Sequence, residues 1–74
     1  MNAQSIGECA GIVWRLLYGD KRRWEYKEIK AVTGLSNRDL NAAIGWLARE
    51  GKIQFINLPD REEALYIELN LYIG

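Results

Sequence analysis

Residues 33–39, TGLSNRD, constrain the fold most strongly, because they end one helix and begin another within a few positions. Gly34 is a natural left-handed helix end, and Ser36 with Asp39 three residues later is a capping box pattern at a helix start. Leu35 supplies an apolar residue between them. Only about three residues therefore separate two helices, which is the spacing of a helix-turn-helix unit.

Another helix is predicted at the N-terminus, before this unit. Ser5 with Glu8 three residues later is a capping box pattern for its start, and Gly19 after Tyr18 is a natural left-handed end. Apolar residues recur at helical spacing on one face, which predicts that this face packs in the core. Its members are Ile6, Ala10, Val13 and Leu17, flanked by Cys9 and Leu16.

The two helices that flank the short turn have clear inward faces. The second helix fits residues 25–34, with Ile29 and Val32 pointing inward. The third fits residues 37–50 and ends before Gly51, a second natural left-handed stop. Its inward side carries Leu40, Ile44 and Leu47.

After the third helix the period of the apolar residues changes from near 3.6 to 2, which indicates strands. Residues 52–58 fit one strand and residues 64–73 a second, with PDREE at 59–63 as the turn. The two faces of the second strand hold Leu65, Ile67, Leu69, Leu71 and Ile73, and Tyr66, Glu68, Asn70 and Tyr72. The pattern predicts a hairpin packed on the helices, and a short extended piece is expected near Arg23 and Trp24.

Charge and residue content limit the chemistry of the chain. Ten Lys and Arg balance ten Asp and Glu, so any nucleic-acid contact must come from a local patch. There is no His, which removes the commonest general base and metal ligand. Cys9 lies on the apolar face of a helix without a basic partner and is expected to be a core residue. We therefore predict no catalytic residue, metal, cofactor or small-molecule ligand.

The expected organisation is one domain over residues 1–74. One cysteine cannot form an internal disulfide, and the sequence shows no secretory leader. No apolar run approaches the roughly 20 residues that span a bilayer. A reduced, cytoplasmic protein that does not enter a membrane is expected.

The order of helix, short strand, helix, turn, helix and hairpin is that of a winged helix. LSNRDLNAAIGWLAREGKIQF, residues 35–55, resembles the third helix and first wing strand of winged helix-turn-helix proteins. Nearly the whole chain resembles the small stand-alone bacterial winged helix-turn-helix family of unknown function. The resemblance implies an α+β fold of three helices and a C-terminal two-stranded wing. It implies a DNA-binding, transcription-related role less strongly, because winged helices also serve dimerisation and protein docking.

If the third helix reads DNA, its outward side makes the contacts. The residues expected there are Asn37, Arg38, Asn41 and Arg49, with Ala42 and Gly45 between them. Arg suits guanine and Asn suits adenine. An ordinary solvated face is the alternative, although a glycine at position 45 suggests a close neighbour such as Trp24, a second chain or DNA.

Weaker phosphate contacts are assigned to basic residues outside this helix. They are Lys21, Arg22 and Arg23, for which a solvated loop is the alternative, and Arg61 in the wing. Residues 53–74 carry a net charge of −3, so the wing is expected to make at most one phosphate contact.

A stripe beside the apolar face of the first helix supports a rival hypothesis. Gly7, Gly11, Trp14 and Tyr18 fall within about 60° of one another, and Tyr66 and Tyr72 are candidates to extend this surface. Aromatic residues are enriched in interface cores, and glycines allow close approach. The stripe predicts a homodimer, with aromatic packing inside one chain as the alternative. The alternative function is accordingly a protein-interaction or self-assembly domain that does not bind DNA.

Overall fold

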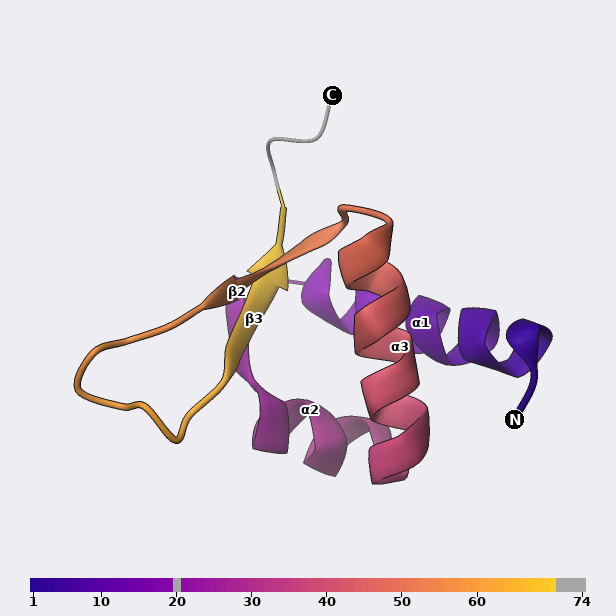
Figure 1. Ribbon diagram of the computed structural model, residues 1–74, viewed down its shortest axis with the longest axis horizontal. Coiled ribbons are helices and arrows are strands. Elements are labelled where there is room, and N and C mark those ends of the chain that lie inside the picture. The colour runs from indigo at the N-terminus through magenta and orange to yellow at the C-terminus, as the bar shows by residue number, and fades with distance from the viewer. Residues whose placement is uncertain (20, 71–74) are drawn as a thin grey trace.

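Three helices pack against a small antiparallel sheet in the computed structural model, which describes residues 1–19 and 21–70 (Figure 1). The elements follow the predicted order. They are α1 (Ala3–Leu17), β1 (Arg23–Glu25), α2 (Tyr26–Thr33), α3 (Asn37–Arg49), β2 (Ile53–Ile56) and β3 (Tyr66–Leu69). The predicted α+β architecture of three helices followed by a hairpin wing is therefore confirmed.

The sheet has three strands in the order β1-β3-β2, so the last strand lies in the middle. Trp24 of β1 and Phe55 of β2 both pair with Ile67 of β3. The short extended piece predicted near Arg23 and Trp24 is thus an edge strand that closes the sheet onto the hairpin. The expected positions Leu71, Tyr72 and Ile73 lie outside the described residues.

The wing strands are shorter than the sequence pattern predicts. Between them, backbone groups within residues 58–64 make local hydrogen bonds instead of extending the ladder. Arg61 N–H donates to the Leu58 carbonyl at 3.0 Å, and Ala64 N–H donates to the Arg61 carbonyl at 3.1 Å. These turns form the loop that extends away from the helices in Figure 1.

The predicted start of the first helix is wrong, whereas its end just before Gly19 is correct in position. Asn2, not Ser5, is the N-cap: its side chain accepts from Ser5 N–H at 2.8 Å, and Ser5 Oγ accepts from Asn2 N–H at 3.0 Å. Glu8 instead accepts a hydrogen bond from Gln4. Asn is as good an N-cap as Ser, so the helix begins at the earlier capping residue. At the other end Tyr18 is the C-cap, and Gly19 does not adopt the left-handed conformation.

The turn between α2 and α3 forms as predicted. Gly34 ends α2 with φ of 71°, a left-handed conformation that glycine adopts without strain, and Ser36 Oγ accepts from Asp39 N–H at 3.1 Å. Ile29 is fully buried, but Val32 is 61% exposed, which contradicts the prediction that both point inward. The buried face of the eight-residue α2 is narrow, because it contains one buried residue, Ile29. Val32 lies outside this face.

The core lies where α1 and α3 cross and meet the sheet. Its buried residues are Ala10, Val13, Leu17, Ile29, Leu40, Ala43, Ile44, Leu47, Ile53 and Ile67. Cys9 packs against this cluster, in agreement with its expected role. Leu40, Ile44 and Leu47 are all buried as predicted, and they fix which side of α3 faces away from the protein.

Candidate nucleic-acid interface

The side of α3 that faces away from the core is an exposed surface. Because successive helical residues are about 100° apart, residues opposite the buried ones share one face. We call this face the α3 ridge, and it consists of the exposed residues Arg38, Asn41, Gly45 and Arg49. Three of the four side chains assigned to DNA contact therefore lie together.

Asn37, the fourth candidate, lies with Asn41 on the edge of the ridge nearest α2. The side chain of Tyr26, the first residue of α2, lies against both. Its hydroxyl donates to Asn41 Oδ1 at 2.7 Å and is 3.5 Å from Asn37 Oδ1. Tyr26 was not among the predicted site residues, because no local pattern links residues 15 positions apart in different helices.

Gly45 sits at the middle of the ridge with open space in front of it. A Cβ atom built at this position would meet no other heavy atom within 4 Å. The neighbour expected there is therefore not Trp24 or another described part of the same chain. Ala42, which was expected on the same face, is only partly exposed.

Lys21 of the predicted basic cluster is engaged within the chain. Its ammonium pairs with Glu28 at 2.5 Å and lies 4.5 Å from the centre of the Trp24 ring. The hydrogen bond from Lys21, together with one from the backbone N–H of Glu25, holds the pKa of the Glu28 carboxyl below its ordinary value. Lys21 is therefore a weaker candidate for a phosphate contact than its sequence position suggests.

Arg22 is also paired. Its Nε donates to Glu68 Oε2 at 3.2 Å, and Gln54 Nε2 donates to Glu68 Oε1 at 2.9 Å. Glu68 follows Ile67 in β3 and so faces away from the core, yet these neighbours leave it only 4% exposed. Arg23, in contrast, is exposed at the edge strand. Within this basic cluster, Arg23 is the side chain most available to an external anion.

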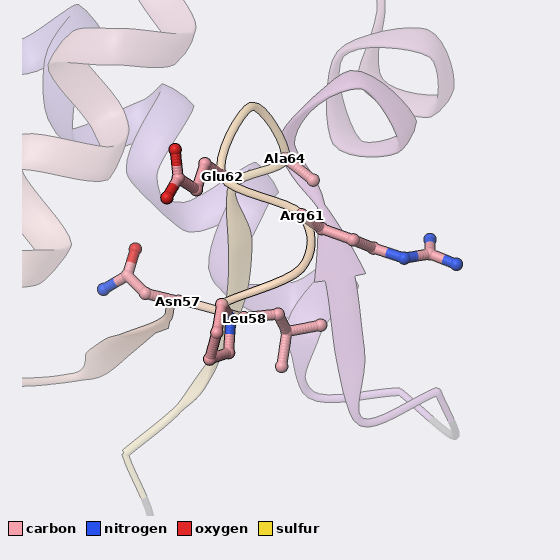
Figure 2. A pocket seen from close by; sticks show the side chains of 6 residues that line it. Asn57, Leu58, Arg61, Glu62 and Ala64 are labelled. Carbon is pink, nitrogen blue, oxygen red and sulfur yellow. The ribbon is translucent and has the colours of Figure 1, made fainter.

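The wing presents one cation beside several acidic residues. The loop curls around a shallow open hollow lined by Asn57, Leu58, Pro59, Arg61, Glu62 and Ala64. Figure 2 shows the Arg61 guanidinium and the Glu62 carboxylate pointing to opposite sides of this loop. Arg61 Nη1 donates to the Tyr66 hydroxyl at 3.3 Å. Arg61 is thus held at the base of the wing.

The glycine and aromatic stripe of α1 also lies on the surface. Gly7, Gly11 and Trp14 line one side of a shallow hollow, and Tyr18 packs beside Trp14 with ring centres 5.1 Å apart. A Cβ atom built at Gly7 would meet nothing within 4 Å. The missing side chain of Gly7 therefore leaves space that no described residue of this chain fills, whereas a Cβ atom at Gly11 would lie 3.5 Å from Arg15 Nη1.

The other side of this hollow comes from α3 and the turn that follows it. Trp46, which is 44% exposed, faces the α1 stripe across the hollow, and Lys52 Nζ lies 5.8 Å from the Trp14 ring centre. Trp46 was not among the predicted interface residues, although its position on α3 between the buried side and the ridge is a usable signal. We call the surface formed by Gly7, Gly11, Trp14, Trp46 and Lys52 the α1 hollow.

The two strand tyrosines do not join the α1 hollow in the described structure. Tyr66 precedes the buried Ile67, so its side chain points to the opposite face of the sheet, and its cross-strand partners are Glu25 and Ile56. Tyr72 lies outside the described residues. Among the described residues of the predicted dimer surface, those that lie together are Gly7, Gly11, Trp14 and Tyr18.

The order of elements and the helix-turn-helix geometry match a known family. Residues 1–69 match the family described as a winged helix-turn-helix domain (DUF2582). The chain belongs to this family. The match covers all the elements described above and agrees with the resemblance found in the sequence. The family description names a winged helix-turn-helix domain.

One relative is an uncharacterised protein, MJ1608, from Methanocaldococcus jannaschii, with 40% identity over 58 residues. The alignment covers 77% of this chain and 81% of the relative. That relative is archaeal, so the family is not confined to the bacteria named in the resemblance.

Solved structures of transcriptional regulators share the fold. The regulator PA4135 superimposes with a TM-score of 0.75 at 15% identity, over 90% of this chain and 52% of its own. A variant of E. coli MarR complexed with operator DNA gives a TM-score of 0.63 at 13% identity, over 96% of this chain and 46% of MarR. This chain therefore spans about half the length of these regulators, and the likeness shows a common fold.

Residues 1–19 and 21–70 contain neither a metal-binding cluster nor a helix suited to cross a membrane. No cluster of three or more His, Cys, Asp and Glu is arranged to hold a metal ion there. None of the described helices has the length and apolar character that crossing a membrane requires.

Proposed function

We propose that this winged helix domain is a transcription-related module that reads duplex DNA with α3. The observation that carries the proposal is the α3 ridge, where Arg38, Asn41 and Arg49 surround a glycine with open space before it. In a helix-turn-helix protein, the second helix of the motif enters the major groove and presents its first turns to the base edges. The fold shared with MarR, one structure of which holds operator DNA, supports this proposal.

The charges on the surface favour a contact made mainly by the helix. Arg38 suits a guanine edge or a phosphate, and Arg49 in the last turn suits a phosphate. Lys21 and Arg22 are paired with carboxylates, and the wing offers Arg61 among acidic residues. We therefore expect weaker specific binding than is usual for the fold. The proposal includes the cytoplasmic location that the sequence predicts.

Removing the two ridge arginines tests the proposal. Arg38→Ala together with Arg49→Ala should weaken duplex binding without changing the melting temperature, because both side chains are exposed. The slope of log affinity against log salt should become shallower by about 0.9 for each phosphate that the variant no longer neutralises. Arg15→Ala, which removes an exposed arginine from α1, is the control and should leave binding unchanged. Unchanged affinity in the double variant would contradict the assigned surface.

A second candidate function is self-association through the α1 hollow. Trp46 is 44% exposed and Tyr18 67% exposed, and the missing side chain of Gly7 leaves open space on the same surface. Aromatic residues at the centre of a surface patch are typical of interfaces, and a symmetric pair would bury the same patch twice. We propose a homodimer through this surface. If DNA is not a ligand, assembly is the function.

Sedimentation of the wild type and of substituted proteins tests the homodimer. Trp14→Ala should convert dimer to monomer, because it removes the ring that lines the α1 side of the hollow. Trp14 also packs on the core, so Tyr18→Glu, which places a charge on an exposed side chain, is the second test. Phe55→Ala, an exposed apolar residue on β2, is the control and should leave the dimer intact. A wild type that sediments as a monomer at high concentration rules the homodimer out.

A further inference from the structure

We propose that Tyr26 is a specificity-determining residue of the α3 ridge, because it binds the side-chain oxygen of Asn41 and leaves only the amide N–H groups to face DNA. The inference rests on the proposed DNA-binding function and deepens it, since it concerns which base the ridge prefers. Tyr26 itself is a positioning residue and acts through Asn41.

The position of Tyr26 is set by contacts at both ends of the residue. Its backbone N–H donates to the carbonyl of Leu65 at 2.7 Å, which ties the first turn of α2 to the chain that enters β3. Its ring is half-buried and packs against the core. The preceding residue, Glu25, caps α2 by accepting from Lys27 N–H at 2.7 Å. The hydroxyl is therefore presented to α3 from a well-anchored ring.

The hydroxyl of Tyr26 meets the oxygen atoms of two ridge-edge asparagines. It donates its one proton to Asn41 Oδ1 at 2.7 Å, and Asn37 Oδ1 lies 3.5 Å away. An asparagine amide has one carbonyl oxygen and an NH₂ group with two donors. With the oxygen of Asn41 turned toward Tyr26, its NH₂ group is turned away from α2. Asn41 itself is exposed, so this group is accessible from outside.

This orientation changes the base that Asn41 suits. A free asparagine pairs with adenine by donating to N7 and accepting from the N6 amino group. An asparagine whose oxygen is engaged offers donors alone, and guanine presents two neighbouring acceptors, N7 and O6. The base pair facing Asn41 should therefore favour guanine over adenine. Without the Tyr26 hydroxyl, the amide is free to turn and make the adenine pair.

Selection from a pool of randomised duplexes, followed by sequencing, tests this preference. The position that Asn41 reads is identified as the one whose base preference disappears in Asn41→Ala. At that position the wild type should prefer guanine to adenine, and Tyr26→Phe should shift the ratio toward adenine by about tenfold. Tyr66→Phe removes a hydroxyl that bonds Arg61 of the wing and not a ridge asparagine, so it is the matched control, with no expected shift in the ratio. A loss of stability alone would lower affinity for all sequences and leave the ratio unchanged.

A measurement on the free protein separates this inference from DNA binding. In Tyr26→Phe the side-chain amide NMR signals of Asn41 should shift clearly, whereas in Tyr66→Phe they should not. Unchanged Asn41 signals, an adenine preference in the wild type, or the same preference in Tyr26→Phe would each overturn the inference alone. A wild type that binds no duplex at low salt would overturn the proposed function, and the base preference with it.

Discussion

Ile29 and Val32 show how much the surroundings of a residue decide its role. Both are branched apolar residues of α2, three positions apart, and the helical pattern assigns them to the same face. The structure buries Ile29 completely, whereas Val32 is 61% exposed near the end of the helix. The free energy that each side chain contributes to folding should differ accordingly.

Alanine substitutions at these two positions are a matched pair. Ile29→Ala should lower the free energy of unfolding by about 2–5 kcal/mol, because it removes buried methylene and methyl groups and leaves a cavity. Val32→Ala should change it by less than about 0.5 kcal/mol, since the side chain is mostly in water and Ala is a better helix former. Chemical denaturation measures both. A large loss of stability in Val32→Ala would mean that this residue packs in the core.

At the scale of the elements, Gly34 and Gly45 have opposite effects on the stability of the helix-turn-helix unit. Gly34 ends α2 in a left-handed conformation with φ of 71°, which a side chain would strain. Gly45 lies inside α3, where helical geometry does not require glycine and no described atom approaches its missing Cβ. The turn therefore requires Gly34. Gly45 lowers the stability of its helix, and no contact with a described residue explains a glycine at this position.

Replacing each glycine by alanine should change stability in opposite directions. Gly45→Ala should raise the free energy of unfolding by about 1 kcal/mol, because alanine is the better helix former. Gly34→Ala should lower it by about 1 kcal/mol, because a Cβ disfavours the left-handed conformation. Thermal unfolding of both variants measures the signs. If Gly45→Ala is stable but binds DNA more weakly, the glycine is retained for close approach of DNA. Destabilisation by Gly45→Ala would contradict the open space in front of α3.

At the scale of the whole molecule, charge is distributed unevenly although the total is zero. The wing loop carries Asp60, Glu62 and Glu63 around a single arginine, while the α3 ridge carries two arginines. In a winged helix bound to DNA in the usual way, the wing lies near phosphates, where acidic residues are unfavourable. The wing should therefore oppose binding that α3 promotes.

Neutralising the wing tests this opposition. A variant with Asp60→Asn, Glu62→Gln and Glu63→Gln should bind duplex DNA several-fold more tightly at low salt, because repulsion from the phosphates is removed. The gain should shrink as salt is added, and the base preference of the ridge should stay the same. Fluorescence anisotropy at several salt concentrations measures the effect. No gain at low salt would indicate that the wing lies away from the DNA.

The sequence by itself determined the features that depend on neighbours along the chain. Gly34 and Gly51 mark helix ends because glycine tolerates positive φ, and both adopt it. The inward face of α3 and the change to strand periodicity follow from local spacing, and with the short piece at Arg23–Glu25 they were sufficient to predict the winged helix. The same local reasoning was wrong at the start of α1, where Asn2 and Ser5 are both good N-cap residues and the helix begins after Asn2.

Tertiary structure decided the features that depend on contacts between distant residues. The hydrogen bond of Tyr26 to Asn41, the approach of Trp46 to the α1 stripe, and the pairing of Arg22 with Glu68 join separate elements. Periodicity places a side chain on a face of its own element, but it does not state which element covers that face. The positions of the α3 ridge could therefore be predicted, whereas the partner that orients its asparagines could not, because that partner is brought there only by the packing of α2 beside α3.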